Sequence, residues 1–284
     1  MWAGVSLHSE VNKILHQGLR GAEVHSVFHK AINLIDQDGC MISLLTKAID
    51  EAPMSILIDT LDFDQWGISV GEKVEASASK ITLGSHIIDL SKARVYELSR
   101  GCFLAGSLQF RKNFETLRQF LTSNHPTLHY SFDKMASQML AERTVVLKEA
   151  CLQHTSSRII QAGRSLLGLG QGLTPSGDDI LMGVFLVLGL EGSPMGDFDQ
   201  LLGEIIAGAG DQTTDVSYQG LLRASQGQYR SILVKAAQGM SDSAEIDDIL
   251  AEVLSIGHTS GWDLLSGIMT GCEILLEKEN RNVN

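Results

Sequence analysis

The sequence contains few cysteines and few basic residues, and both shortages argue against classes of function. The four cysteines, Cys40, Cys102, Cys151 and Cys272, lie far apart and form neither a Cys-x-x-Cys motif nor a Cys/His metal spacing. They are typical of reduced, mostly buried thiols in a cytoplasmic protein. The formal net charge of −12 at pH 7 argues against nucleic acid and anionic membranes as partners, because basic surfaces bind both.

A secretion signal and a membrane-spanning run are also missing. Residues 1–10 lack the basic segment and long apolar stretch of a signal peptide. The longest apolar run, residues 180–190, is shorter than the ~20 residues that cross a bilayer. We therefore expect a soluble protein of the cytoplasm with no membrane partner.

Little in the sequence indicates a metal or a nucleotide. No Gly-Lys-Ser/Thr follows the glycines of residues 168–172, which disfavours a nucleoside-triphosphate loop. His25 and His29 lie four residues apart in an expected strand, but two ligands alone rarely make a zinc site. We expect neither a metal nor a cofactor.

The sequence pattern changes from β-type to helical part of the way along the chain. Residues 22–110 contain short β-type segments separated by Gly and Asp turns, including a hairpin signal at Asp38-Gly39 and a short capped helix at 91–97. From about residue 112 the apolar residues follow a helical period. We therefore predict an α+β protein: a small β-barrel or sandwich-like domain over residues 1–115, then an all-α domain over residues 116–284.

The most informative segment is residues 168–179, Gly-Leu-Gly-Gln-Gly-Leu-Thr-Pro-Ser-Gly-Asp-Asp. Its alternate glycines allow a tight turn and close approach to a ligand. The apolar run after it predicts a buried helix, and Ser176 with Asp179 fits a capping box that starts this helix. Because a helix N-terminus offers unpaired N–H groups and partial positive charge, the segment favours a phosphate or carboxylate ligand.

The same element occurs a second time. Residues 176–183 and 260–267 share the pattern Ser-Gly-x-Asp-apolar-Leu-x-Gly, which indicates an internal duplication or two uses of one capping geometry. The closing glycine of each copy costs helix stability, so close helix–helix contact is its expected compensation. We predict that the two helices cross and that their N-termini converge on one anion pocket.

The candidate site residues follow from this arrangement. If Asp179 and Asp263 cap their own helices, Asp178 has no structural task, so it is free to orient a ligand amide, act as a base or hold a metal. We select Asp178 and His258 as catalytic candidates, since a histidine titrates near neutral pH. The candidate substrate-binding residues are Gly170, Gly172, Thr174, Ser176, Gly177, Thr213, Thr214, Thr259, Ser260 and Gly261. Thr213 and Thr214 also fit a simple helix cap.

Three segments together resemble a bacterial family. They are residues 169–179, the Thr-Thr pair at 213–214 with Ser217, and Gly-His-Thr-Ser-Gly-Trp-Asp at 257–263. They are similar to the AllH subunit of oxamate carbamoyltransferase. The resemblance implies a complex with two other subunit types, in which phosphate cleaves carbamoyl-oxamate to oxamate and carbamoyl phosphate during allantoin breakdown, a branch of purine catabolism. It implies activity only with those partner subunits, and a small anionic substrate.

Two alternatives stay open on the residues alone. One is a Mg²⁺-dependent hydrolase in which Asp178, Asp179, Asp215 and Asp263 form a carboxylate cluster. The other is a non-catalytic scaffold subunit whose glycine loop packs against a partner.

Overall fold

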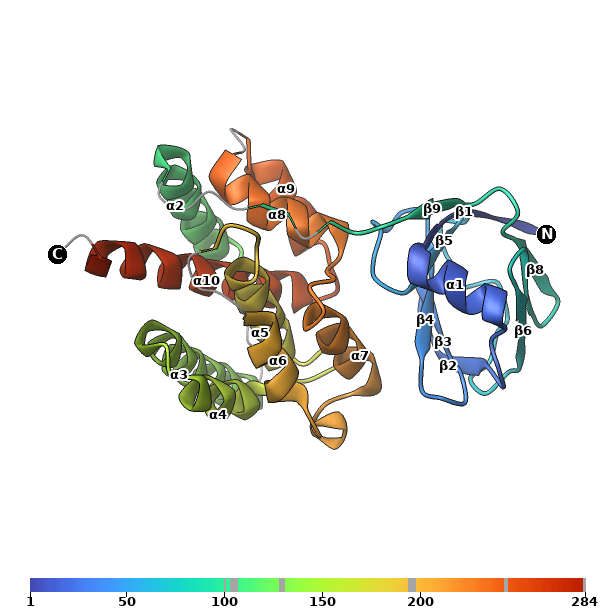
Figure 1. Ribbon diagram of the computed structural model, residues 1–284, viewed down its shortest axis with the longest axis horizontal. Helices are drawn as coiled ribbons and strands as arrows, with labels where there is room; N and C mark the ends of the chain where they lie inside the picture. Colours follow the sequence, from blue (N-terminus) through green and yellow to red (C-terminus); the bar gives the residue numbers. More distant parts are fainter. Residues whose placement is uncertain (100, 103–106, 128–130, 194–197, 243–244, 283–284) are drawn as a thin grey trace. The chain divides into compact units, whose positions relative to one another are not determined.

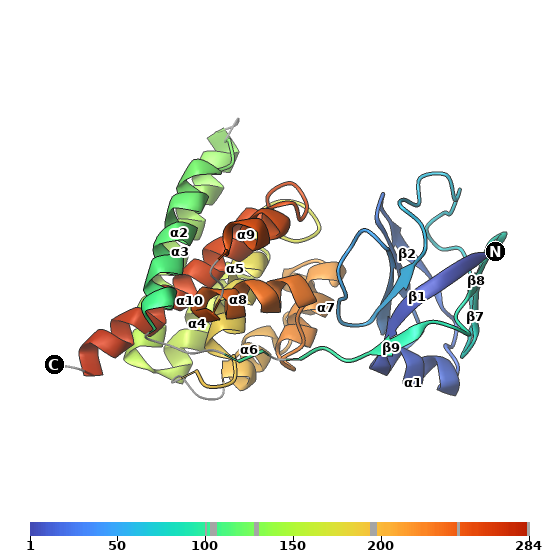
Figure 2. The ribbon, with the colours of Figure 1, turned by 90° about the horizontal axis from the view of Figure 1, so that it is seen from above.

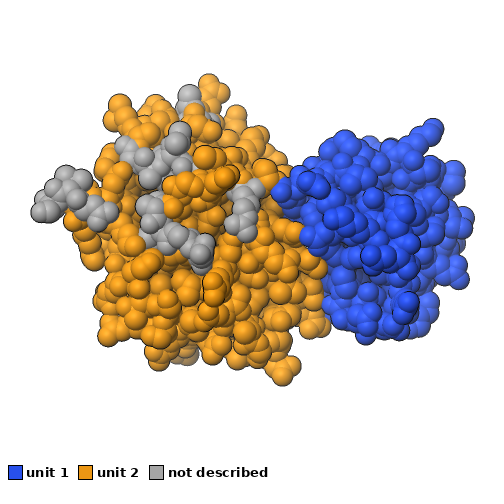
Figure 3. All heavy atoms as spheres, viewed as in Figure 1, with its two compact units in different colours: residues 1–98 blue, residues 99–284 orange. Residues whose placement is uncertain are grey.

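The computed structural model describes residues 1–99, 101–102, 107–127, 131–193, 198–242 and 245–282. The chain divides into two compact units, residues 1–98 and 99–284 (Figure 3). The first unit is built on a mixed β-sheet and the second on helices, which confirms the predicted α+β class. Among the described residues, no helix combines the length and the hydropathy needed to cross a membrane.

The N-terminal unit is one strongly curved sheet. Its described strands follow the order β2-β3-β4-β5-β1-β8-β7-β6, with β9 added beside β1. The strands are β1 (Trp2–His8), β2 (Glu23–Val27), β3 (Ala31–Ile35), β4 (Met41–Thr46), β5 (Ser55–Ile58), β6 (Val74–Ser77), β7 (Lys80–Leu83), β8 (His86–Asp89) and β9 (Arg94–Tyr96). Helix α1 (Ser9–Gln17) follows β1 and buries Val11 and Leu15.

Backbone hydrogen bonds bring the two ends of this sheet together. Val24 N donates to Glu72 O at 2.9 Å, and Val74 N donates to Ala22 O at 2.9 Å. The contacts join β2 to the segment that leads into β6, so the sheet is nearly closed (Figure 1). A nearly closed sheet leaves few unpaired edge groups, and it encloses an apolar core that includes Ile32, Leu44 and Ile56.

Three details of this unit differ from the prediction. The single strand expected to contain His25 and His29 is replaced by two strands, β2 and β3, because Phe28 N donates to Ala31 O and closes a turn. His29 therefore lies outside a strand and contacts Asp64 instead of sharing a face with His25. The expected helix at 91–97 contains strand β9, which pairs with β1 in parallel. By contrast, the hairpin around Asp38-Gly39 is confirmed, since β3 and β4 pair antiparallel.

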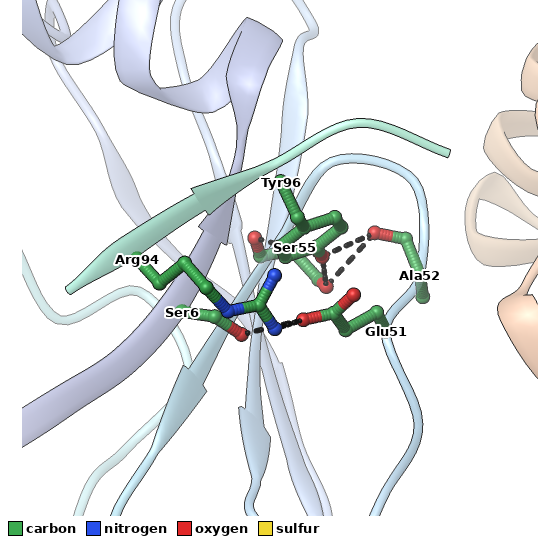
Figure 4. A network of polar contacts seen from close by, with 6 residues as sticks. All are labelled: Ser6, Glu51, Ala52, Ser55, Arg94 and Tyr96. Atoms are coloured by element: carbon green, nitrogen blue, oxygen red, sulfur yellow. Dashed lines mark hydrogen bonds and ion pairs between the residues drawn. The ribbon is translucent and has the colours of Figure 1, made fainter. Parts of the chain in front are cut away.

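A polar network holds β9 in place (Figure 4). Tyr96 Oη donates to Ala52 O at 2.7 Å and lies 2.8 Å from Ser55 Oγ, while Arg94 pairs with Glu51. Burial raises the pKa of Tyr96 to about 12, so its hydroxyl is neutral. These contacts join β9 to the segment between β4 and β5 and explain why residues 94–96 are extended rather than helical.

The helical unit is arranged around α5 (Ser176–Leu188), in which almost every residue is buried. Helix α10 (Ser260–Asn282) crosses it and forms its most extensive contact (Figures 1 and 2). The other helices are α2 (Leu108–Ser123), α3 (Ser131–Gln153), α4 (Ser156–Leu166), α6 (Phe198–Ile206), α7 (Asp215–Ala224), α8 (Ser231–Asp242) and α9 (Asp247–Leu254). A 3₁₀ turn, Gly210–Gln212, precedes α7.

Candidate functional site

The N-termini of α5 and α10 lie together, as predicted. Thr174 Oγ1, just before α5, is 2.7 Å from Ser260 Oγ, the first residue of α10. The loops that lead into the two helices lie beside one another (Figure 2). We call Thr174, Ser176, Asp179, Thr259, Ser260 and Asp263 the paired N-terminus cluster.

Small residues make this convergence possible. A Cβ added to Gly183 of α5 would lie 2.3 Å from Leu264 O, and one added to Gly267 of α10 would lie 2.3 Å from Ile180 O. Both distances are far below van der Waals contact, so only glycine allows the two backbones to come this close. The structure thus confirms the expected reason for the closing glycine of each repeat.

Both helices also begin in the same way. Gly177 N donates to Leu169 O at 2.8 Å, and Gly261 N donates to Ile256 O at 2.9 Å. A Cβ on Gly177 would lie 2.0 Å from Leu166 O, and one on Gly261 would lie 2.3 Å from Val253 O. Each of these two glycines therefore packs against the end of the preceding helix, α4 or α9, and the two copies have matching surroundings.

The glycine-rich loop folds back over the start of α5. Gly168 and Gly170 have φ values of +65° and +128°, which strain residues with a side chain. A Cβ on Gly170 would lie 2.6 Å from Ser176 N. In the part of the chain that the structure describes, the amides of Gly170, Gly172, Ser176 and Ser260 donate no hydrogen bond.

Asp178 has a structural role, and the expectation that it has none is wrong. Its side chain is fully buried. Oδ1 accepts from Gly168 N at 2.9 Å, while Oδ2 accepts from Ser217 Oγ at 2.7 Å and from Thr213 Oγ1. The carboxylate therefore ties the glycine loop, α5 and α7 together.

The capping prediction for Asp179 and Asp263 is also wrong. Pro175 occupies the N-cap position of α5 and makes no side-chain cap. The two carboxyls instead have hydroxyl neighbours from both helix starts, Ser260 and Thr174 at Asp179 and Ser176 and Thr259 at Asp263, so the two serines are paired crosswise with the aspartates. The serine of each repeat thus contacts the aspartate of the other. The matched Ser-x-x-Asp spacing places these residues at the two helix starts, but it does not indicate which helix each aspartate contacts.

Both aspartates are buried close to other charges. Their exposed fractions are 4% for Asp179 and 5% for Asp263. Burial raises the pKa of Asp263 to about 6, against the hydrogen bonds from Ser176 and Thr259. Burial also raises the pKa of Asp179 well above its usual value, and the charges of Asp263 and Asp178 add to this increase. Among the described residues, Oδ2 of each carboxyl has no hydrogen-bond partner.

The remaining candidates lie at the edge of the cluster. Thr214 Oγ1 donates to Leu173 O and accepts from Ser217 N at 3.1 Å. It therefore caps α7 and also contacts the glycine-rich loop. Thr213 reaches the loop through Asp178. His258 is exposed in the turn before α10, and Gly172 is exposed in the loop with φ +88°.

The other candidate features show neither a metal-binding arrangement nor a catalytic-serine turn in the described residues. Within the described ranges, no group of three or more His, Cys, Asp or Glu side chains has a metal-binding arrangement, and this includes Asp178, Asp179, Asp215 and Asp263. The N-terminal unit has an open hollow, lined by Val27, Phe28, His29, Phe63, Asp64, Gly67 and Ile68. Beside it, residues 67–71 spell Gly-x-Ser-x-Gly but lie between β5 and β6 rather than in the strand-to-helix turn that a catalytic serine needs.

Two protein-family models match most of the chain. Residues 3–95, the curved sheet, match the AllH family N-terminal domain. The chain belongs to the AllH family. Residues 166–272, from the glycine loop into α10, match oxamate carbamoyltransferase subunit AllH. No solved structure matches the chain.

Proposed function

We propose that this chain is a subunit of a cytoplasmic oxamate carbamoyltransferase complex and that the paired N-terminus cluster binds its small anionic substrate. In the proposed reaction an oxygen of phosphate attacks the carbamoyl carbon of carbamoyl-oxamate. The bond from this carbon to the oxamate nitrogen breaks, and the nitrogen takes up a proton. The products are oxamate and carbamoyl phosphate, in the direction of allantoin breakdown.

The observation that carries this proposal is the convergence of two helix N-termini with unpaired N–H groups and four hydroxyls. Two helix dipoles directed at one place favour an anion. The N–H groups of Gly170, Gly172, Ser176 and Ser260 have no partner in the described part of the chain. Backbone donors also suit the tetrahedral oxyanion of carbamoyl transfer, at about 3–4 kcal/mol for each donor.

The proposed roles of the candidate residues differ with their positions. Thr174, Ser176, Thr259 and Ser260 line the ligand site, in which Ser176 and Ser260 offer backbone N–H groups, while Gly177 and Gly261 allow the close packing behind them. Thr213 and Thr214 hold the loop. His258 is the candidate for proton transfer, because it is exposed beside Ser260. Asp178, which the sequence suggested for proton chemistry, is assigned to positioning, because both its oxygens hold the loop and α7.

An activity assay of the assembled complex tests the proposal. Carbamoyl phosphate is measured from carbamoyl-oxamate and phosphate, with this chain alone, the partner subunits alone, and all subunits together. We expect activity only from the full complex, and a strong loss in Ser176→Ala/Ser260→Ala. Full activity of that double variant would make the chain a scaffold. Loss of activity in EDTA, recovered with Mg²⁺, would favour metal-dependent hydrolysis.

A further inference from the structure

The paired N-terminus cluster places two carboxyl groups directly behind an arrangement that attracts anions. Asp179 and Asp263 are each at least nineteen-twentieths buried. Among the described residues, each has one oxygen, Oδ2, with no donor. A buried acceptor without a donor is costly, so two at symmetric positions indicate that a donor is supplied from outside the chain.

The surroundings of the two carboxyls define which donor fits. The hydroxyls of Ser260 and Thr174 bond Asp179, and those of Ser176 and Thr259 bond Asp263. The charged group nearby on their own helices, apart from the pair itself, is Asp178, which is already bonded. A metal ion is not the expected partner of these two oxygens, because the described residues contain no set of ligands for one. The expected donor is therefore an uncharged N–H group.

We propose that the cluster selects an anion that also carries amide or ureido N–H groups, and that Asp179 and Asp263 accept those N–H groups. This inference rests on the proposed function and names the residues that give it substrate specificity. The helix N-termini bind the carboxylate or carbonyl oxygens of the ligand, while the paired carboxyls bind its nitrogen. A ligand with a second carboxylate in place of the amide meets two acceptors and is repelled.

Oxamate and oxalate separate these two cases, because they have almost the same size and shape. Oxamate carries one carboxylate and one amide, whereas oxalate carries two carboxylates. A site that hydrogen-bonds an N–H group rejects an analogue without it, because its buried polar groups then stay unpaired. The proposal therefore predicts selectivity between two ligands that a simple anion site would bind alike.

The test is calorimetric titration of oxamate and of oxalate into the full-length chain assembled with its partner subunits, at about pH 8. We expect the wild type to bind oxamate about tenfold or more tightly than oxalate, as the loss of a hydrogen bond to a buried charged group implies. In Asp263→Asn and Asp179→Asn the ratio should fall to about twofold or reverse, because the new amide donates to oxalate. Asp248→Asn, an exposed charge at the start of α9, is the matched control and should keep the wild-type ratio.

Each outcome decides the proposal. Equal binding of both ligands by the wild type, or an unchanged ratio in Asp263→Asn, overturns this inference and leaves the anion site intact. Failure of both ligands to bind the wild type overturns the proposed function at this site and the inference with it. Should both variants fail to fold, the wild-type ratio at about pH 5 replaces them: protonated Asp263 donates to oxalate, so the ratio must narrow, and an unchanged ratio counts against the proposal.

Discussion

Replacing Asp263 by asparagine tests whether the carboxyl pair is a source of instability in the unliganded protein. In the folded chain burial raises the pKa of Asp263 from 3.8 to about 6. At 1.36 kcal/mol for each pH unit, this difference corresponds to about 3 kcal/mol. Asp263 is only 5% exposed, so screening by solvent reduces this figure little.

The sign of the effect follows from proton binding. Between about pH 4 and about pH 6 the folded state holds a proton on Asp263 that the unfolded state has lost. The free energy of unfolding therefore falls as the pH rises through this window and levels off above it. Asp179 acts in the same direction, because its pKa is also raised. Asparagine does not titrate, so the variant should lack the Asp263 part of this decline.

The assay is urea unfolding of wild type and Asp263→Asn from about pH 5 to about pH 8. Circular dichroism at the helix band follows mainly the helical unit, because α1 is the one described helix outside it. We expect the variant to be more stable by about 1–2 kcal/mol near pH 5 and by up to about 3 kcal/mol near pH 8. Parallel pH profiles of the two proteins would refute the reasoning, and Asp248→Asn controls for a simple change of net charge.

Two further predictions concern the geometry behind the site. Gly267→Ala should lower the free energy of unfolding by about 1–3 kcal/mol or more, because its Cβ would lie 2.3 Å from Ile180 O. Thermal unfolding measures this loss. The control is Gly203→Ala, whose Cβ would have its nearest neighbour at 3.9 Å, and it should be neutral or stabilising. Asp178→Asn should lower the free energy of unfolding by about 2–3 kcal/mol, since it loses the oxygen that accepts from Thr213 and Ser217. It should also speed proteolysis at residues 168–174. A variant with the stability and cleavage rate of the wild type would contradict a positioning role.

Local patterns in the sequence predicted the helical unit better than the sheet. The apolar run that became α5 is buried on every side, so its composition alone indicates its state. The local sequence does not predict the turn at residues 28–30, because His29 and Lys30 are not typical turn residues. Strand β9 depends on pairing with β1, more than eighty residues earlier, and a short segment carries no local signal of such a partner. The predicted elements do not include helix α1, although its buried residues Val11 and Leu15 have the four-residue spacing of a helix face.

The repeat predicted where the two helices meet but not how their aspartates are used. A Ser-x-x-Asp spacing is compatible with a cap on the same helix, and that local interpretation suffices for one helix viewed alone. When two such helices cross at Gly183 and Gly267, each carboxyl gains a serine hydroxyl neighbour from the other helix. The crosswise bonds arise from tertiary packing, which neither copy of the pattern contains.

A ligand explains why the chain keeps a carboxyl pair that costs it stability. Burial of two neighbouring carboxyls disfavours their charged forms, and asparagine at either position would keep the hydroxyl neighbours without this cost. A ligand that binds only the folded state adds about 2.7 kcal/mol of stability when its concentration is a hundred times its dissociation constant. This gain is similar to the loss of about 3 kcal/mol attributed to Asp263. An N–H group placed on Oδ2 would satisfy the acceptor and relieve the repulsion together. The stabilisation by oxamate should therefore be smaller in Asp263→Asn than in the wild type, although the unliganded variant is the more stable protein.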